Sequence, residues 1–156
     1  MSKFPSRATH KTLIQNQEVD FQGIEKLSQL ADAVEEVVRS DDFIRKVVEE
    51  KWNTIWGHCA VATAAMQILA WQVYGIYLDT YNAPAPNSDS VSHWFLSTPE
   101  GVLIDPTAYQ FEDADYLTSL YQRAIRKGHP SRRSLPPFTN SPPVKYIIQR
   151  VTEKLL

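Results

Sequence analysis

The 156-residue sequence predicts a single α+β domain, in which a buried helix packs on a small antiparallel sheet and further helices lie at both ends. Three observations support this prediction. Apolar residues recur at helical spacing before residue 50, and the stretch from Trp52 to Leu78 carries no charge. Two short segments with strand composition flank a turn at 98–101 that contains proline and glycine. A chain of this length buries about two-thirds of the surface that it exposes when unfolded, so one core is sufficient.

The N-terminal part is expected to be a flexible arm followed by two helices. Residues 1–20 are polar and lack a periodic apolar pattern, which leaves a single domain over residues 21–156. From Ile24 to Val38, apolar residues recur at three- and four-residue steps, as on one face of a helix. Ser40 is of a type that caps helices, and acids follow it, so a second helix should begin there.

The uncharged stretch predicts the central helix. A membrane span needs about 20 predominantly apolar residues, whereas Gln67 interrupts the apolar run here. A helix that is apolar on all sides is otherwise buried in a core. We therefore expect a buried helix over 58–74, ended by Gly75, and no association with a membrane.

The second half of the chain predicts the sheet and two more helices. β-branched and aromatic residues predict a strand over 76–81 and two more over 91–96 and 102–104, joined by the turn. A helix is expected over 113–127. The last helix should run from Pro143, a residue type that favours the first helical turn, to residue 155.

Charge and cysteine content exclude several classes of protein. The net charge of −2 argues against a nucleic-acid-binding surface. The single cysteine, Cys59, excludes an intramolecular disulfide and a cysteine-rich zinc site. The N-terminal residues lack the apolar core of a signal peptide, so we expect a cytoplasmic protein with a reduced thiol.

Cys59 stands at the predicted start of the buried helix. Free backbone N–H groups and the helix dipole stabilise a thiolate at that position. The same N–H groups can stabilise the oxyanion that develops on a substrate carbonyl. The alternative interpretation is that Cys59 is a small apolar core residue, as a lone cysteine on an apolar helix commonly is.

His93 and Asp105 are equidistant from Pro99, the centre of the expected hairpin. This register would set them directly opposite each other on one face of the sheet, with Cβ atoms about 4.5–5.5 Å apart. If that face packs on the helix start, His93 reaches Cys59 and the three side chains form a nucleophile, a base and an orienting carboxylate. A one-residue slip would send them to opposite faces. In the alternative, the histidine is structural and the aspartate only caps a turn.

The same three residues could form a mixed zinc site, but this is less well supported. His58 and Cys59 are adjacent, and neighbours on a helix point about 100° apart. They therefore cannot both join one ligand set, which leaves Cys59, His93 and Asp105 alone. We expect no metal and no cofactor.

Several short blocks resemble the YunG-like family. Residues 56–61 (Trp-Gly-His-Cys-Ala-Val) resemble its Trp-Gly-Gln-Cys-Ala-Val helix start. Residues 92–94 (Ser-His-Trp) and 105–111 (Asp-Pro-Thr-Ala-Tyr-Gln-Phe) resemble its His-Tyr-Trp and Asp-Leu-Thr-x-x-Gln-Phe blocks. The resemblance covers about residues 50–150. The order of cysteine, histidine and aspartate is also similar to that in papain-like, transglutaminase-like and NlpC-type amidase folds.

The resemblance implies a papain-like core and a thiol hydrolase or acyl transferase. The substrate would be an amide or thioester of a peptide, a protein or a small molecule. Whether the chain is a peptidase, an amidase or a deamidase stays open, as does its oligomeric state. The alternative is a papain-like module without catalysis that binds a protein partner.

Five further residues near these blocks are candidates for the site. Papain-like enzymes place a glutamine six residues before the cysteine, where this chain has Asn53, and the YunG-like family has glutamine where this chain has His58. Both residues are candidates for holding an oxyanion, and Asn53 is equally consistent with a helix cap. The candidates for the wall of a substrate cleft are Trp56, Trp94 and Tyr109.

Overall fold

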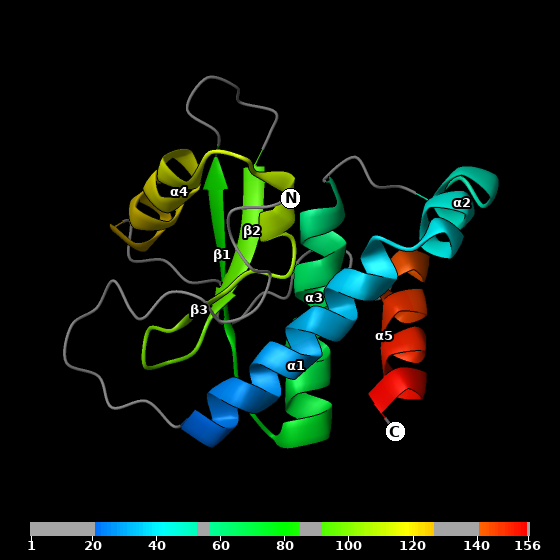
Figure 1. The fold of residues 1–156 in the computed structure, drawn as a ribbon, viewed down its shortest axis with the longest axis horizontal. Coiled ribbons are helices and arrows are strands. Elements are labelled where there is room, and N and C mark those ends of the chain that lie inside the picture. The colour runs from blue at the N-terminus through cyan, green and yellow to red at the C-terminus, as the bar shows by residue number, and fades with distance from the viewer. Residues whose placement is uncertain (1–20, 53–56, 85–91, 127–140, 156) are drawn as a thin grey trace.

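The computed structural model of the chain describes residues 21–52, 57–84, 92–126 and 141–155. Within these ranges, five helices accompany a three-stranded antiparallel sheet, which confirms the α+β class (Figure 1). The arm predicted over residues 1–20 lies outside the described residues. The elements are α1 (Phe21–Val38), α2 (Asp41–Glu49), α3 (Gly57–Tyr74), β1 (Asp79–Pro84), β2 (Ser92–Ser97), β3 (Leu103–Ile104), a 3₁₀ turn (Ala108–Gln110), α4 (Ala114–Arg126) and α5 (Pro142–Leu155).

Helices α1 and α2 form where the apolar periodicity and the cap predict them. Leu30 and Val34 on the apolar face of α1 are fully buried. Ser40 links the two helices. Its hydroxyl donates to the carbonyl oxygen of Val37 at 2.6 Å and accepts from the backbone N–H of Phe43 at 3.1 Å. This cap satisfies one of the free N–H groups at the start of α2.

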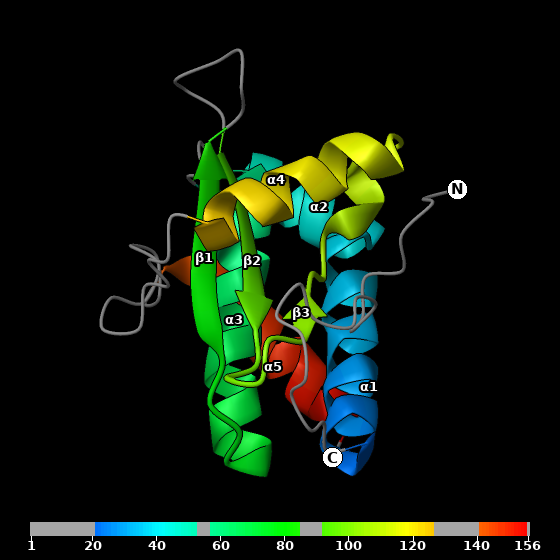
Figure 2. The same cartoon turned by 90° about the vertical axis from the view of Figure 1, so that its left-hand side faces the viewer.

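Helix α3 is the central helix, as predicted from its lack of charge. Helices α1 and α5 and the sheet all pack against it (Figures 1 and 2). Gly75 ends it with φ of 66°, a left-handed conformation that favours glycine, and its N–H donates to the carbonyl of Trp71 at 2.9 Å. Among the described residues, no helix combines the length and the apolar character needed to cross a membrane. Small side chains let the neighbouring elements approach α3, and five of them are fully buried: Ala60, Ala62, Ala64, Ala65 and Ala70.

Strand β1 begins later than predicted, at Asp79 instead of residue 76. The reason is the end of α3, because the N–H of Ile76 donates to the carbonyl of Ala70 at 3.1 Å and thereby belongs to the helix closure. The strand also extends further, to Pro84. Proline is tolerated there because β1 is at the edge of the sheet, where a missing N–H costs no hydrogen bond on the open side.

The hairpin between β2 and β3 also differs from the prediction. Leu96 pairs with Ile104, so the hairpin is centred one residue later than Pro99. The N–H of Thr98 donates to the carbonyl of Val102 at 2.9 Å, which closes a three-residue loop. Gly101 has φ of 93° in this loop, the conformation for which three-residue hairpin loops need glycine.

The sheet separates two groups of helices, with α4 on one face and α1, α3 and α5 on the other (Figure 2). Neighbouring residues of a strand point to opposite faces, so Leu96 packs with α1, α3 and α5 whereas Phe95 packs with α4. We call the two apolar clusters the helical cluster and the aromatic cluster. The helical cluster consists of buried apolar residues of α1, α2, α3 and α5 together with Leu78, Leu96 and Ile104. The aromatic cluster consists of Tyr81, Ala83, Phe95, Leu103, Ala108, Leu117, Leu120, Tyr121 and Ala124.

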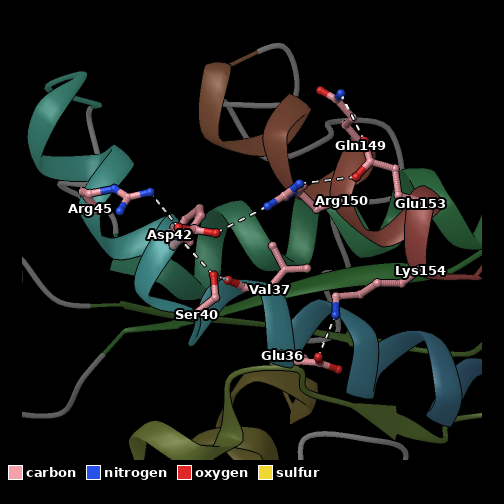
Figure 3. A network of polar contacts seen from close by, with 10 residues as sticks. Glu36, Val37, Ser40, Asp42, Arg45, Gln149, Arg150, Glu153 and Lys154 are labelled. Carbon is pink, nitrogen blue, oxygen red and sulfur yellow. Dashed lines mark hydrogen bonds and ion pairs between the residues drawn. The ribbon is translucent and has the colours of Figure 1, made fainter.

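A network of ion pairs joins α5 to α1 and α2 at the surface (Figure 3). Lys154 contacts Glu36 at 2.6 Å, and Arg150 contacts Asp42 at 3.5 Å. These side chains are 40–67% exposed. Solvent and salt screen such pairs, so we attribute the packing of α5 mainly to its buried apolar residues.

Candidate active site

The structure brings Cys59, His93 and Asp105 together at one end of the sheet. Cys59 lies in the first turn of α3, His93 lies in β2 and Asp105 follows β3. The Nε2 atom of His93 is 2.5 Å from Oδ2 of Asp105. All three side chains are buried, with 5%, 4% and 2% of their residue surfaces exposed, respectively.

His93 and Asp105 meet diagonally, which corrects the prediction that they lie directly opposite each other. With Leu96 opposite Ile104, the position opposite Asp105 is that of Phe95, and His93 lies two residues further along β2. A two-residue offset keeps a side chain on the same face. Diagonal neighbours are about 7–8 Å apart, a distance that an imidazole and a carboxylate can span. The predicted pair therefore forms despite the wrong register.

His93 also reaches the cysteine. A side-chain hydrogen bond joins its ring to Cys59. Because Asp105 occupies Nε2, Nδ1 is the ring nitrogen left to face the sulfur. Burial alone lowers the pKa of His93, but the charge and hydrogen bond of Asp105, followed by those of Cys59, raise it to about 10. His93 is therefore an imidazolium at neutral pH, which places a positive charge beside the Cys59 sulfur.

Asp105 accepts hydrogen bonds from three residues. Its Oδ2 atom accepts hydrogen bonds from His93 and from the hydroxyl of Tyr121, the latter at 2.6 Å. Its Oδ1 atom accepts hydrogen bonds from the backbone N–H of Thr107 at 3.1 Å and from the Thr107 hydroxyl at 3.4 Å. A carboxylate can be buried only when it is paired and hydrogen-bonded in this way.

Tyr121 and Thr107 were not predicted as site residues. The Asp-x-Thr pattern of residues 105–107 is a signal for a local turn that could have identified Thr107. Tyr121 carries no such signal, because a tyrosine on the apolar face of a helix reads as a core residue. Only the packing of α4 against the sheet brings its hydroxyl to Asp105.

Aromatic rings enclose the imidazole. The ring of Phe111 meets that of His93 edge-on at 4.6 Å between centroids, and Phe95 stacks on it at 6.1 Å.

Burial raises the pKa of Tyr121 well above its usual value, and the charge of Asp105 adds to this effect. The phenol therefore stays protonated and donates throughout the physiological pH range.

Of the two oxyanion candidates, only His58 is described. It is half-buried and its ring packs edge-on against Phe43 of α2, with 5.4 Å between centroids. Burial lowers the pKa of His58, so its imidazole is neutral at pH 7 and keeps one N–H donor. Asn53 lies outside the described residues.

Tyr109 lies near Cys59 and Asp105, whereas the side chain of Trp94 lies on the face of the sheet opposite to that of His93. Tyr109 is half-buried beneath the guanidinium of Arg39, at 4.6 Å. Burial raises the pKa of Tyr109 to about 12, Arg39 opposes this rise, and the electrostatic effects of Glu35, Cys59 and Asp105 add to it. Trp94 follows His93 in β2, and its side chain is therefore on the other face of the sheet. The third cleft candidate, Trp56, lies outside the described residues.

Comparison with known proteins found no match to a family model, to a curated protein or to a solved structure. Within the ranges that the structure describes, no three histidine, cysteine, aspartate or glutamate side chains are grouped so that they could hold a metal ion.

Proposed function

We propose that the chain is a cysteine-dependent hydrolase or acyl transferase acting on an amide or thioester, with Cys59, His93 and Asp105 as its catalytic residues. One observation carries this proposal: His93 contacts the Cys59 sulfur and the Asp105 carboxylate at the same time. A nucleophile, a base and a group that orients the base are the parts that acyl transfer requires. We further propose that the chain has a papain-like core, because its cysteine, histidine and aspartate follow one another in an order similar to that of papain-like folds.

The reaction would proceed through a thioester. The Cys59 thiolate attacks the carbonyl carbon, and the imidazolium of His93 gives its proton to the leaving amine or thiol as the bond to that group breaks. Water then attacks the thioester while His93 accepts one of its protons, which releases the acid and regenerates the thiolate. In a transferase an amine takes the place of water. Asp105 holds the imidazole in the orientation that both steps need.

The start of α3 supplies the first donors for the oxyanion. Cys59 lies in the first turn of a helix whose N-terminal N–H groups have no partner inside the helix. These N–H groups can donate to the negative charge that develops on a substrate oxygen. His58, neutral and half-buried, is the described side chain closest in sequence that could add a donor.

Alkylation of Cys59 by iodoacetamide tests the proposal. An ordinary thiol has a pKa of about 8.5 and reacts slowly at pH 6 because little of it is thiolate. We expect fast alkylation of the wild type at pH 6 and a rate about 100-fold lower in His93→Gln. Gln keeps an N–H donor for Asp105, so this variant tests the imidazole itself. A rate that is slow in the wild type and unchanged in His93→Gln would refute the catalytic assignment.

A second candidate is the catalytically idle module that binds a protein partner. The burial of all three side chains favours it, since at most 5% of any of these residues is exposed. Incubation with an activated aryl ester or thioester separates the two candidates. An enzyme forms an acyl group on Cys59, detected by mass spectrometry, and then loses it in repeated turnovers. An idle module shows no turnover, and its Cys59→Ala variant is indistinguishable from the wild type.

A further inference from the structure

Tyr121 comes from α4 and shares one oxygen of Asp105 with His93. Its hydroxyl donates to Oδ2 at 2.6 Å, while Nε2 of His93 is 2.5 Å from the same atom. The tyrosine is 1% exposed, so bulk water does not compete for this oxygen. Two donors on one buried oxygen divide its charge between them.

We propose that Tyr121 is a positioning residue that fixes the Asp105 carboxylate and, by sharing Oδ2, limits how strongly His93 holds its proton. This inference rests on the proposed function. In the first half of that reaction His93 has to give its proton to the leaving group, and an imidazolium stabilised by an undivided carboxylate would hold that proton too strongly. Tyr121 thus brings the basicity of His93 closer to the range that catalysis at neutral pH needs.

Among the described residues, the titratable groups that face His93 are Asp105 after β3, Cys59 from α3 and Tyr121 from α4, whose ring centroid lies 6.4 Å from that of the imidazole. The other rings that pack against it, Phe95 and Phe111, carry no charge. Tyr121 itself stays neutral because burial, and then the charge of Asp105, raises its pKa well above the usual value. Its effect is therefore that of a constant donor.

The test is a titration of His93 by NMR of its ring nitrogens, in the full chain and in Tyr121→Phe. We expect the His93 midpoint to rise by about one pH unit in this variant, which is about tenfold in proton affinity. The phenylalanine ring keeps its contact with Phe95, so packing is preserved. Tyr116→Phe is the matched control, because Tyr116 lies on the same helix, is half-buried and packs on Phe111. Its midpoint should equal that of the wild type.

A midpoint in folded Tyr121→Phe that is unchanged or lower would overturn the inference. If the variant fails to fold, 3-fluorotyrosine at position 121 replaces it. This more acidic phenol donates a stronger hydrogen bond and should lower the His93 midpoint, and an unchanged midpoint again overturns the inference. If wild-type Cys59 reacts slowly with iodoacetamide at pH 6, the proposed function and this inference both fail. Fast alkylation of Cys59 together with an unchanged His93 midpoint in Tyr121→Phe would refute only the proposed role of Tyr121.

Discussion

Buried polar groups on the two faces of the sheet differ in how fully they are hydrogen-bonded. On the α4 side, Asp105 accepts from His93, Tyr121 and Thr107, so the carboxylate is fully satisfied. On the α3 side, the Thr63 hydroxyl is buried without a hydrogen-bond partner in the described structure. Gln67 is buried too, and its amide N–H ties α3 to the backbone before β1 through the carbonyl of Leu78, at 2.8 Å. The face covered by α1, α3 and α5 is therefore stabilised mainly by apolar packing, whereas the buried polar groups on the α4 side are hydrogen-bonded around Asp105.

The largest effect is expected from breaking the helical cluster. Leu30 in α1 is fully buried there. We expect Leu30→Ala to lower the free energy of unfolding by about 2–5 kcal/mol, measured by urea denaturation, because it removes buried apolar area and leaves a cavity. Ile44→Ala is the control, since Ile44 is 48% exposed and its loss should cost little. Folded Leu30→Ala should alkylate at Cys59 as fast as the wild type, and slower alkylation would mean that the two faces are not independent.

The next effect is a dependence of stability on pH that arises on the α4 side. The folded-state pKa of His93, about 10, lies above its unfolded value of 6.5. Folding therefore binds a proton, and the resulting stabilisation is fully present below pH 6.5 and is lost as the pH rises toward 10.

Urea denaturation of the wild type and of His93→Gln across this range measures the effect. The free energy of unfolding of the wild type should fall with pH relative to that of the variant, which has no imidazole to titrate. If the free energies of unfolding of the two proteins changed in parallel with pH, this would contradict the ion pair between His93 and Asp105.

The smallest expected effect is an unchanged or raised stability on substitution of Thr63, on the α3 side of the sheet. We expect Thr63→Val to leave the protein unchanged or to stabilise it by about 1 kcal/mol, because the buried hydroxyl has no hydrogen-bond partner among the described residues and its removal relieves a desolvation penalty. Thr107→Val is the matched substitution on the other face, where the hydroxyl contacts Asp105 at 3.4 Å. It should destabilise the protein. Thermal unfolding of both variants checks the signs, and a destabilised Thr63→Val would indicate that this hydroxyl has an ordered partner.

The sequence predicted the helices well because their signals are local. The spacing of apolar residues in α1, the cap at Ser40 and the glycine at position 75 each act within a few residues. The start of β1 was predicted three residues early, since composition alone does not reveal that Ile76 completes the end of α3.

The site was predicted in part. His93 and Asp105 were expected on one face, and they share it, but the loop with Gly101 in a left-handed conformation shifts the register. The pair still forms because the pairing register differs from the predicted one by two residues, which leaves His93 and Asp105 on the same face of the sheet. Tyr121 was missed because its role depends on how α4 docks on the sheet. No periodicity or spacing in one sequence encodes that long-range contact.

The site is assembled from segments far apart in the chain, and this has a consequence for synthesis on the ribosome. His93 precedes Asp105 by 12 residues and Asp105 precedes Tyr121 by 16, whereas Cys59 comes earlier than all three. The cysteine therefore emerges long before the groups that would activate it. Under the proposed function, His93 and Asp105 can act on Cys59 only after β2 and β3 have been made and have packed near the start of α3. Fast alkylation of Cys59 would then report that the sheet and α3 have packed together.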